Sequence, residues 1–366
     1  MESCQNLLLD AYIQGVDPYG FLASFFKVPS KAMRSMTRGA AGKISVPLMF
    51  NGEEIAIPQL CCGATTGNVI SKTDVMELTV PKYSEEYTID DCDLYNAPFG
   101  INEYDAAMIA DIERIFNYGS MGLIRMGNSH NRAIELQAAQ IWQTGSLSLT
   151  DQNADQVYTY DFPKEDSNFP TTAKAWDNPL TCDPRADITA LVTAIKTNGS
   201  CNPDIMIMNS VTFDKFLKAD KIRSESDLLR VNNIMIEQDK ESPRDGRVLQ
   251  GTFSAGGSIL TIYTYDKTYK DPATGNKTKY INDDKVIILD SSSRFDIVPT
   301  HVPRFKSSRN PYSDRMPSTL PLHKIPNGIQ VNPWLSGNNR VLHIETYQNT
   351  VLIPTALNDY GCLTTA

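Results

Sequence analysis

The segment from Val28 to Gly100 contains no run of residues that favours a helix. Prolines and glycines recur along it and divide it into short pieces. Three of these pieces, residues 43–50, 54–60 and 75–80, carry the apolar and β-branched side chains typical of strands. Loops longer than about 12 to 15 residues are uncommon in a compact domain. The segment therefore favours an extended arm with short strands, and we expect its packing partners to lie on another subunit.

An aromatic cluster precedes this arm, with the sequence DPYGFLASFFK at residues 17–27. Pro18 suits a first helical turn, and Phe21, Phe25 and Phe26 follow at helical spacing. Burying one Phe side chain is worth roughly 1.5 to 3 kcal/mol. The cluster is therefore predicted to be an anchor, although the sequence does not say which surface it binds.

Residues 102–116 have the features of a helix, since Asn102 suits the N-cap and an apolar stripe recurs every three to four residues. Glycines interrupt the pattern between residues 119 and 127, and each costs up to about 1 kcal/mol inside a helix. The apolar period then resumes over residues 134–142. One long helix with a weak middle and two helices in line are equally compatible with this pattern.

The second half of the chain has the pattern of a mixed α+β module. Residues 146–149 and 157–162 alternate around a polar turn, which predicts a β-hairpin before the module. The elements expected after it are helices at 184–199 and 213–219, and strands at 205–208, 260–265 and 286–289.

The last part of the chain begins with an irregular stretch at residues 299–339, rich in Pro, Ser, Asn and Arg. Two strands follow, VLHIETY and TVLIPTA, and a turn at Gln348 and Asn349 is predicted to separate them. Because terminal strands are ordered by pairing, we expect the C-terminal part to return to a sheet.

Composition restricts the class of function. The chain has 366 residues, of which 41% are hydrophobic and 21% charged, as is ordinary for a globular protein. Its net charge of −9 disfavours a dedicated nucleic-acid binder, because such proteins neutralise phosphates with Lys and Arg. The 7 cysteines form no C-x-x-C pair, which fits a reducing compartment. Neither a signal peptide nor a membrane span is recognisable, so we expect a protein that is not embedded in a membrane.

No catalytic motif stands out. The 4 histidines have no carboxylate or thiol at ligand spacing, and the adjacent Cys61 and Cys62 suit small buried side chains better than a strained disulfide. Residues 251–258, GTFSAGGS, resemble a phosphate-binding loop, but Gly257 stands where the lysine is needed and a strand-like segment follows. We therefore predict a β-turn there, and no catalytic residue, cofactor or metal site.

Several segments, in order along most of the chain, resemble one family. DPYGFLASFFK is similar to an N-terminal signature of a proline, Phe-Leu, and Phe-Phe followed by a basic residue. Residues 79–91, 132–149 and 183–195, the strand DIMIMN with TFDKF, and the closing residues 332–360 look like further parts of the same pattern. The chain thus resembles the major capsid proteins of tailed bacteriophages, of the lambda head-protein (E) type with the HK97-like fold.

The resemblance implies an α+β architecture in five parts. These are an N-terminal arm (1–33), an extended E-loop (34–92), a P-domain with a spine helix and a β-hairpin (93–182), an axial A-domain (183–340) and returning P-domain strands (341–366). The irregular stretch at 299–339 and the loop KDPATGNKTK match the family pattern less closely.

The resemblance also implies a function, which is self-assembly into the pentamers and hexamers of an icosahedral shell around double-stranded DNA, without catalytic turnover. Expected partners are other copies of the chain, decoration, scaffolding and portal proteins, and DNA that is contacted weakly; no membrane is expected. The expected location is the virion, after assembly in the host cytoplasm. Two alternatives are another self-assembling virion component, such as a tail-tube or decoration protein, and a hydrolase with an unrecognised site.

Aromatic and basic residues are expected at the contacts between subunits, because aromatic side chains dominate interface energetics. The predicted contact residues are Phe21, Phe25, Phe26, Lys31, Arg34, Arg38 and Trp142. The basic residues belong to a run from Lys27 to Lys43 that contains no acid. Contact with packaged DNA, pairing with acidic patches of a neighbour, and a solvated loop all remain open for this run.

Overall fold

The computed structural model describes residues 19–28, 43–47, 75–90, 107–150, 156–199, 201–223, 234–235, 246–271, 274–299, 329–336 and 341–365. Their contacts divide the chain into two compact units. Unit 1 consists of Met1–Gly20, Val80–Ile134 and Val298–Val351, and unit 2 consists of Phe21–Thr79, Glu135–Ile297 and Leu352–Ala366. Each unit therefore combines segments that are far apart in the sequence.

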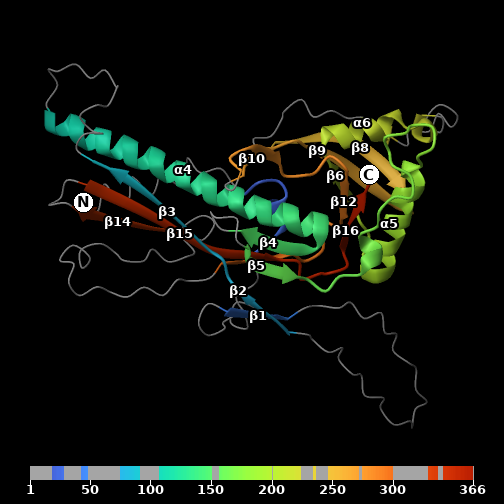
Figure 1. Cartoon of the computed structure of the whole chain (residues 1–366), viewed down its shortest axis with the longest axis horizontal. Coiled ribbons are helices and arrows are strands. Elements are labelled where there is room, and N and C mark those ends of the chain that lie inside the picture. The colour runs from blue at the N-terminus through green and yellow to red at the C-terminus, as the bar shows by residue number, and fades with distance from the viewer. Residues whose placement is uncertain are drawn as a thin grey trace, which may run out of the picture. The chain divides into compact units, whose positions relative to one another are not determined.

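Unit 1 contains the first part of a long helix, α4 (Ala107–Thr144), and antiparallel strands. The central strand is β15 (Val341–Ile353), drawn in red in Figure 1. It pairs along one edge with β3 (Lys82–Ile89) and along the other with β14 (Gln330–Ser336). Strand β13 (Asp296–Pro299) also pairs with β15.

The helix and the sheet of unit 1 meet in a small apolar cluster. Its members are Ile89, Leu123, Met126, Ile329 and Ile344. Gly122 of α4 lies against the ring of Tyr87 on β3, so closely that a Cβ atom would overlap the ring carbons. The glycine that weakens the helix by propensity is thus required by the packing.

Unit 2 is built on a six-stranded sheet. In spatial order its strands are β16 (Tyr360–Thr364), β12 (Lys285–Leu289), β6 (Ile205–Met208), β9 (Ser258–Tyr265), β8 (Arg247–Ala255) and β7 (Ile234–Met235). Strands β6 and β9 are parallel, and the other neighbours are antiparallel.

Two helices pack with this sheet, namely α5 (Pro184–Gly199) and α6 (Ser210–Lys218), both visible in Figure 1. The apolar stripe of α5 and the Phe residues of α6 join the inward side chains of the strands in one core cluster. Members from the helices are Ile188, Leu191, Val192, Ile195, Phe213 and Phe216. The apolar side chains that recur at helical spacing in the sequence therefore face the core, as an amphipathic pattern predicts.

The C-terminal end of α4 leads into a hairpin of unit 2. Gly145 has φ 64°, in the left-handed region that favours glycine, and its N–H bonds to the carbonyl of Ile141 at 2.8 Å. The remaining elements of the unit are β4 (Ser146–Thr150) paired with β5 (Gln156–Asp161), β1 (Lys43–Pro47) with β2 (Val75–Thr79), β10 (Thr268–Lys270) with β11 (Lys277–Lys279), and the 3₁₀ turns η1 (Ala23–Phe25) and η2 (Asp166–Asn168).

Several predictions from sequence are confirmed. The two predicted helices of the second half exist as α5 and α6, and Gly256 and Gly257 lie in the turn between β8 and β9. The long helical pattern forms one helix, α4. None of the helices in the described part of the chain is long and apolar enough to cross a membrane.

Other predictions are wrong. No turn separates two strands at Gln348 and Asn349, because β15 continues through both residues while their backbone pairs with β3. Residues 330–336 form the strand β14 rather than irregular chain, and β10, β11 and β16 were not predicted. The strand expected at 54–60 and the N-cap at Asn102 lie outside the described residues. The five-part domain division remains a prediction.

Candidate functional site

The aromatic cluster near the start of the chain packs into unit 2. Phe21 and Phe26 are 2% and 4% exposed, and Leu22 is fully buried, whereas Phe25 keeps part of its surface exposed. The turn η1 forms only three residues of 3₁₀ helix, which is short of the helix that the spacing suggested. The segment therefore docks as a single turn with its aromatic side directed into the core.

Two side chains of α4 bind the backbone of this turn. The carboxylate of Glu135 accepts hydrogen bonds from the N–H groups of Leu22 and Ala23, each at 2.9 Å. The indole N–H of Trp142 donates to the carbonyl of Leu22 at 3.0 Å. A 3₁₀ turn leaves its first N–H groups without internal partners, and Glu135 supplies the acceptor that a capping residue normally provides.

Glu135 is buried and accepts a third hydrogen bond, from the hydroxyl of Tyr265 at 2.7 Å. Burial raises the pKa of Glu135, while the hydrogen bonds from Tyr265, Leu22 and Ala23 and the charge of Lys267 oppose the rise. Removing the carboxylate would leave two buried backbone donors unsatisfied. The group therefore fixes the position of the turn.

Aromatic rings also pack against the side chains of the turn. The ring of Trp142 lies 4.9 Å from that of Phe26, 4.7 Å from Phe295 and 5.0 Å from Tyr360. Phe21 has its own partners in the sheet, with its ring 5.2 Å from that of Tyr263 and the guanidinium carbon of Arg247 5.3 Å from its centre. Such pairs add to the free energy of burial.

The chain leaves the turn through an isolated β-bridge at Lys27. The N–H of Lys27 donates to the carbonyl of Phe295 at 2.8 Å, and the N–H of Ile297 donates to the carbonyl of Lys27 at 3.0 Å. These two bonds form a parallel bridge between Lys27 and Asp296. Side-chain packing, carboxylate capping and backbone pairing thus act together on the segment from Phe21 to Lys27, which we call the anchor.

A family model described as phage major capsid protein E matches residues 70–356, well over half of the chain. The chain belongs to this family. It is therefore a major capsid protein, which self-assembles into a phage shell and is part of the virion. No curated protein matches its sequence at a significant level.

Solved structures show the same fold for this capsid protein. A prophage protein of E. coli CFT073, described as a capsid protein, has a TM-score of 0.63 at 14% identity, with 98% of both chains covered. A phage-related protein from Bordetella bronchiseptica RB50 has a TM-score of 0.50 at 10% identity, covering 98% of this chain and 96% of the other. The fold is α+β and HK97-like, as the sequence resemblance implied.

Four of the predicted contact residues of the capsid protein lie together in unit 2. Phe21, Phe25, Phe26 and Trp142 form one aromatic group within the chain. Lys31, Arg34 and Arg38 lie outside the described residues. A role for any of these residues in contacts between subunits remains a prediction.

Sequence reasoning missed Glu135, which binds the anchor, and Tyr265, which donates to Glu135. One signal was available, because Glu135 lies within the apolar stripe that runs from Ile134 to Trp142. An acid on the apolar face of a helix needs buried donors to satisfy it. Its partners, however, are backbone groups more than one hundred residues away in the sequence, and no local pattern predicts them.

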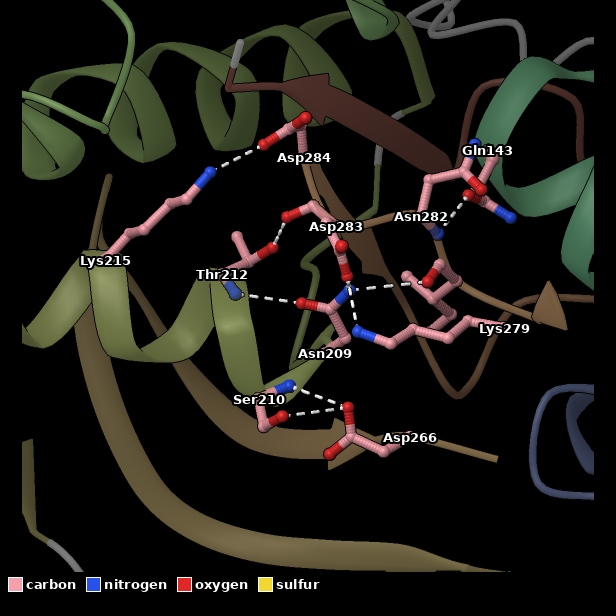
Figure 2. Close-up of polar contacts among 11 residues, drawn as sticks. Gln143, Asn209, Ser210, Thr212, Lys215, Asp266, Lys279, Asn282, Asp283 and Asp284 are labelled. Carbon is pink, nitrogen blue, oxygen red and sulfur yellow. Dashed lines mark hydrogen bonds and ion pairs between the residues drawn. The ribbon is translucent and has the colours of Figure 1, made fainter. Parts of the chain in front are cut away.

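A second polar cluster in unit 2 surrounds the loop before β12 (Figure 2). The side chain of Asn209 caps α6 by accepting from the N–H of Thr212 at 2.8 Å, and it donates to the carboxylate of Asp283 at 2.7 Å. Lys279 lies 2.5 Å from the same carboxylate and lowers the pKa of Asp283. At the N-terminus of α6, Asp266 accepts hydrogen bonds from both the N–H and the hydroxyl of Ser210 at 3.0 Å.

The same loop is tied on two further sides. Lys215 of α6 lies 2.8 Å from Asp284 and 2.7 Å from Asp177, and these carboxylates raise the pKa of Lys215. The N–H of Asn282 donates to the side chain of Gln143 at the end of α4, at 3.0 Å. The cluster therefore joins α4, α6 and the strand β12. Among the described residues, no group of His, Cys, Asp and Glu is arranged to hold a metal ion.

Proposed function

We propose that this capsid protein assembles as pentamers and hexamers into an icosahedral shell around double-stranded DNA, without catalytic turnover. The family match over residues 70–356 is the observation that supports the proposal. The proposal includes decoration, scaffolding and portal proteins as further partners, weak contact with the DNA, and assembly in the host cytoplasm.

The buried titratable groups fit a structural role. His130 is hydrogen-bonded to the hydroxyl of Thr346 at 3.0 Å, and Glu135 binds the anchor. Asp296 accepts from the hydroxyl of Thr355 at 2.9 Å and pairs with Arg294 at 3.1 Å. Each of these groups is engaged in holding segments of its own unit, as expected where stability rather than chemistry is selected.

Electron microscopy of the purified recombinant protein tests the proposal most directly. We expect closed icosahedral particles with five-fold and six-fold clusters of subunits. Tubes would favour a tail-tube protein instead, and a small monodisperse species in sedimentation would contradict assembly and reopen the hydrolase alternative.

The proposed assembly includes contacts between subunits through the predicted aromatic residues. Phe25 is the best placed of the aromatic residues, because its ring keeps surface that a neighbouring subunit can cover, whereas Trp142 is fully buried within the chain. We expect Phe25→Ala to lower the shell yield clearly and to lower the free energy of unfolding of the unassembled chain only slightly. Equal shell yields for variant and wild type would count against the contact.

The basic run is tested separately by Arg34→Glu with Arg38→Glu. Loss of shells would favour pairing with acidic patches of a neighbour, and normal shells with less packaged DNA would favour a DNA contact. Unchanged assembly and packaging would leave the solvated loop as the interpretation of Lys31, Arg34 and Arg38.

A further inference from the structure

The hairpin of β10 and β11 in unit 2 places positive charges opposite one another. In its antiparallel register Lys270 pairs with Lys277, Tyr269 with Thr278 and Thr268 with Lys279. Alternate residues of a strand point to opposite faces. Lys270, Lys277 and Lys279 therefore share one face of the hairpin, which we call the lysine face.

On the opposite face, Tyr269 packs on the rest of unit 2, while its partner Thr278 is exposed. The ring of Tyr269 is half-buried and lies 5.0 Å from the ring of Tyr280, which is itself buried. Burial raises the pKa of Tyr269. Because Tyr269 is fixed inward, Lys270 and Lys277 are held on the outside, and both are exposed.

The carboxylates close to the hairpin in the sequence are already engaged. Asp283 pairs with Lys279, Asp266 caps α6, and Asp271 accepts from the hydroxyl of Thr274 at 2.8 Å inside the turn. In the part of the chain that the structure describes, no carboxylate forms an ion pair with Lys270 or Lys277.

Like charges directly opposite in a sheet destabilise the pair of strands. In an isolated chain, the Lys270 and Lys277 pair is thus unfavourable, and an anionic group placed between the two ammonium groups reverses the sign of the interaction. The geometry points to a partner that offers carboxylates or phosphates.

We propose that the lysine face contacts carboxylates of a second copy of this chain in the assembled shell. The inference rests on the proposed function, since it needs subunits side by side. Two observations favour a second copy over DNA. The chain has 43 acidic against 34 basic residues, so a neighbouring copy offers an excess of carboxylates. A duplex, by contrast, offers only negative charge, which the net charge of −9 opposes, whereas a second copy also carries 34 basic residues.

Charge reversal tests the proposal. The variant Lys270→Glu/Lys277→Glu is compared with the control Lys174→Glu/Lys218→Glu, which changes two other exposed lysines by the same total charge. We expect the hairpin variant to lose about tenfold or more in shell yield without DNA present, and the control to assemble as the wild type does. Circular dichroism and melting of the unassembled chains show that both variants fold, and Lys270→Gln/Lys277→Gln provides a milder second variant.

Cross-linking identifies the partner. Shells assembled from a mixture of isotope-labelled and unlabelled chains, free of DNA, are treated with a carbodiimide that joins amines to carboxylates in contact. We expect Lys270 or Lys277 to be linked to an Asp or Glu peptide of the other isotope. Normal shells from the hairpin variants, with no link between copies, would overturn the proposal.

Two other outcomes are distinct from that result. Normal empty shells from the hairpin variant, together with weaker binding of a short synthetic DNA duplex, would assign the lysine face to nucleic acid and overturn the proposal. Wild-type protein that forms no particles would instead contradict the proposed function itself, and the inference with it.

Discussion

Unit 2 and unit 1 differ in the side chains that hold a helix against a sheet. In unit 2 the core cluster draws large side chains from two helices and from the strands of the six-stranded sheet. In unit 1 the described apolar cluster is small, and polar groups share the interface: His130 binds Thr346, and Ser129 of α4 donates to Glu85 of β3. Apolar burial stabilises both units, and buried titratable groups, Glu135 in unit 2 and His130 in unit 1, make stability depend on pH as well. We therefore expect unit 2, with the larger described apolar core, to be the more stable unit, and His130 to lower the stability of unit 1 in mild acid.

The largest effect is expected in unit 2, at the anchor. Trp142→Ala removes the ring that contacts Phe26, Phe295 and Tyr360, together with the bond to the carbonyl of Leu22. We expect the free energy of unfolding of unit 2 to fall by about 3 to 5 kcal/mol, measured by urea denaturation. The control Trp142→Phe keeps a ring but loses the N–H donor, and should cost about 1 to 2 kcal/mol. A cost below that of the control would show that the anchor does not depend on this side chain.

The second effect is specific to unit 1 and depends on pH. Burial lowers the pKa of His130 from 6.5 to about 4. The unfolded chain then takes up the proton before the native chain does, so the contribution of His130 to the stability of unit 1 is constant above pH 6.5 and is lost as the pH drops toward about 4. The full loss is about 3 kcal/mol at 1.36 kcal/mol per pKa unit.

Hydrogen exchange of amides in β15 and α4 as a function of pH measures this loss. The groups that face His130 are Thr346 of β15 and the ring of Tyr83 on β3, with the carboxylate of Glu85 held nearby by Ser129. His130→Gln keeps a hydrogen-bonding side chain without the titration and should flatten the profile in this range. Identical profiles for variant and wild type would refute the assignment.

The smallest effect is expected from Glu135→Gln, which tests the capping of the anchor. The amide keeps one acceptor oxygen but turns an NH₂ group toward a backbone donor, so one of the N–H groups of Leu22 and Ala23 loses its partner. A cost of about 1 to 3 kcal/mol follows, with faster exchange of those two amides. Tyr265→Phe is the matched control, because it removes one donor and leaves both backbone contacts in place. Unchanged exchange in Glu135→Gln would remove the carboxylate from the account of the anchor.

The local sequence pattern correctly predicted the helices and turns whose conformation depends on residues close in sequence. Helix α5 has an N-cap, an N1 proline and an apolar stripe that faces the core, and the turn between β8 and β9 has the two glycines that such turns require. Pattern failed for β15, where Gln348 and Asn349 read as a turn. Pairing with β3, more than two hundred residues earlier in the chain, keeps these residues extended. Local preference is weak, and tertiary pairing overrides it.

The candidate site shows the same division. The aromatic members of the anchor were predicted because Phe is large and apolar and the three residues are close in sequence, and the packing of Phe21 and Phe26 agrees with that apolar character. Glu135 was missed because its role is to accept hydrogen bonds from two backbone N–H groups that only folding brings to it. The lysine face was read as a polar loop, since only the register sets Lys270 opposite Lys277.

The sequence by itself determined the family and the α+β module. It also determined that residues 102–142 favour helix and that the anchor is apolar. Each of these properties depends on composition and on spacing between residues close in sequence. Only the tertiary structure decided that α4 continues through its glycines, where Gly122 meets the ring of Tyr87, and that a buried carboxylate caps the anchor. Those outcomes depend on contacts between distant segments, and their free energy appears only once the chain has closed the loops between them.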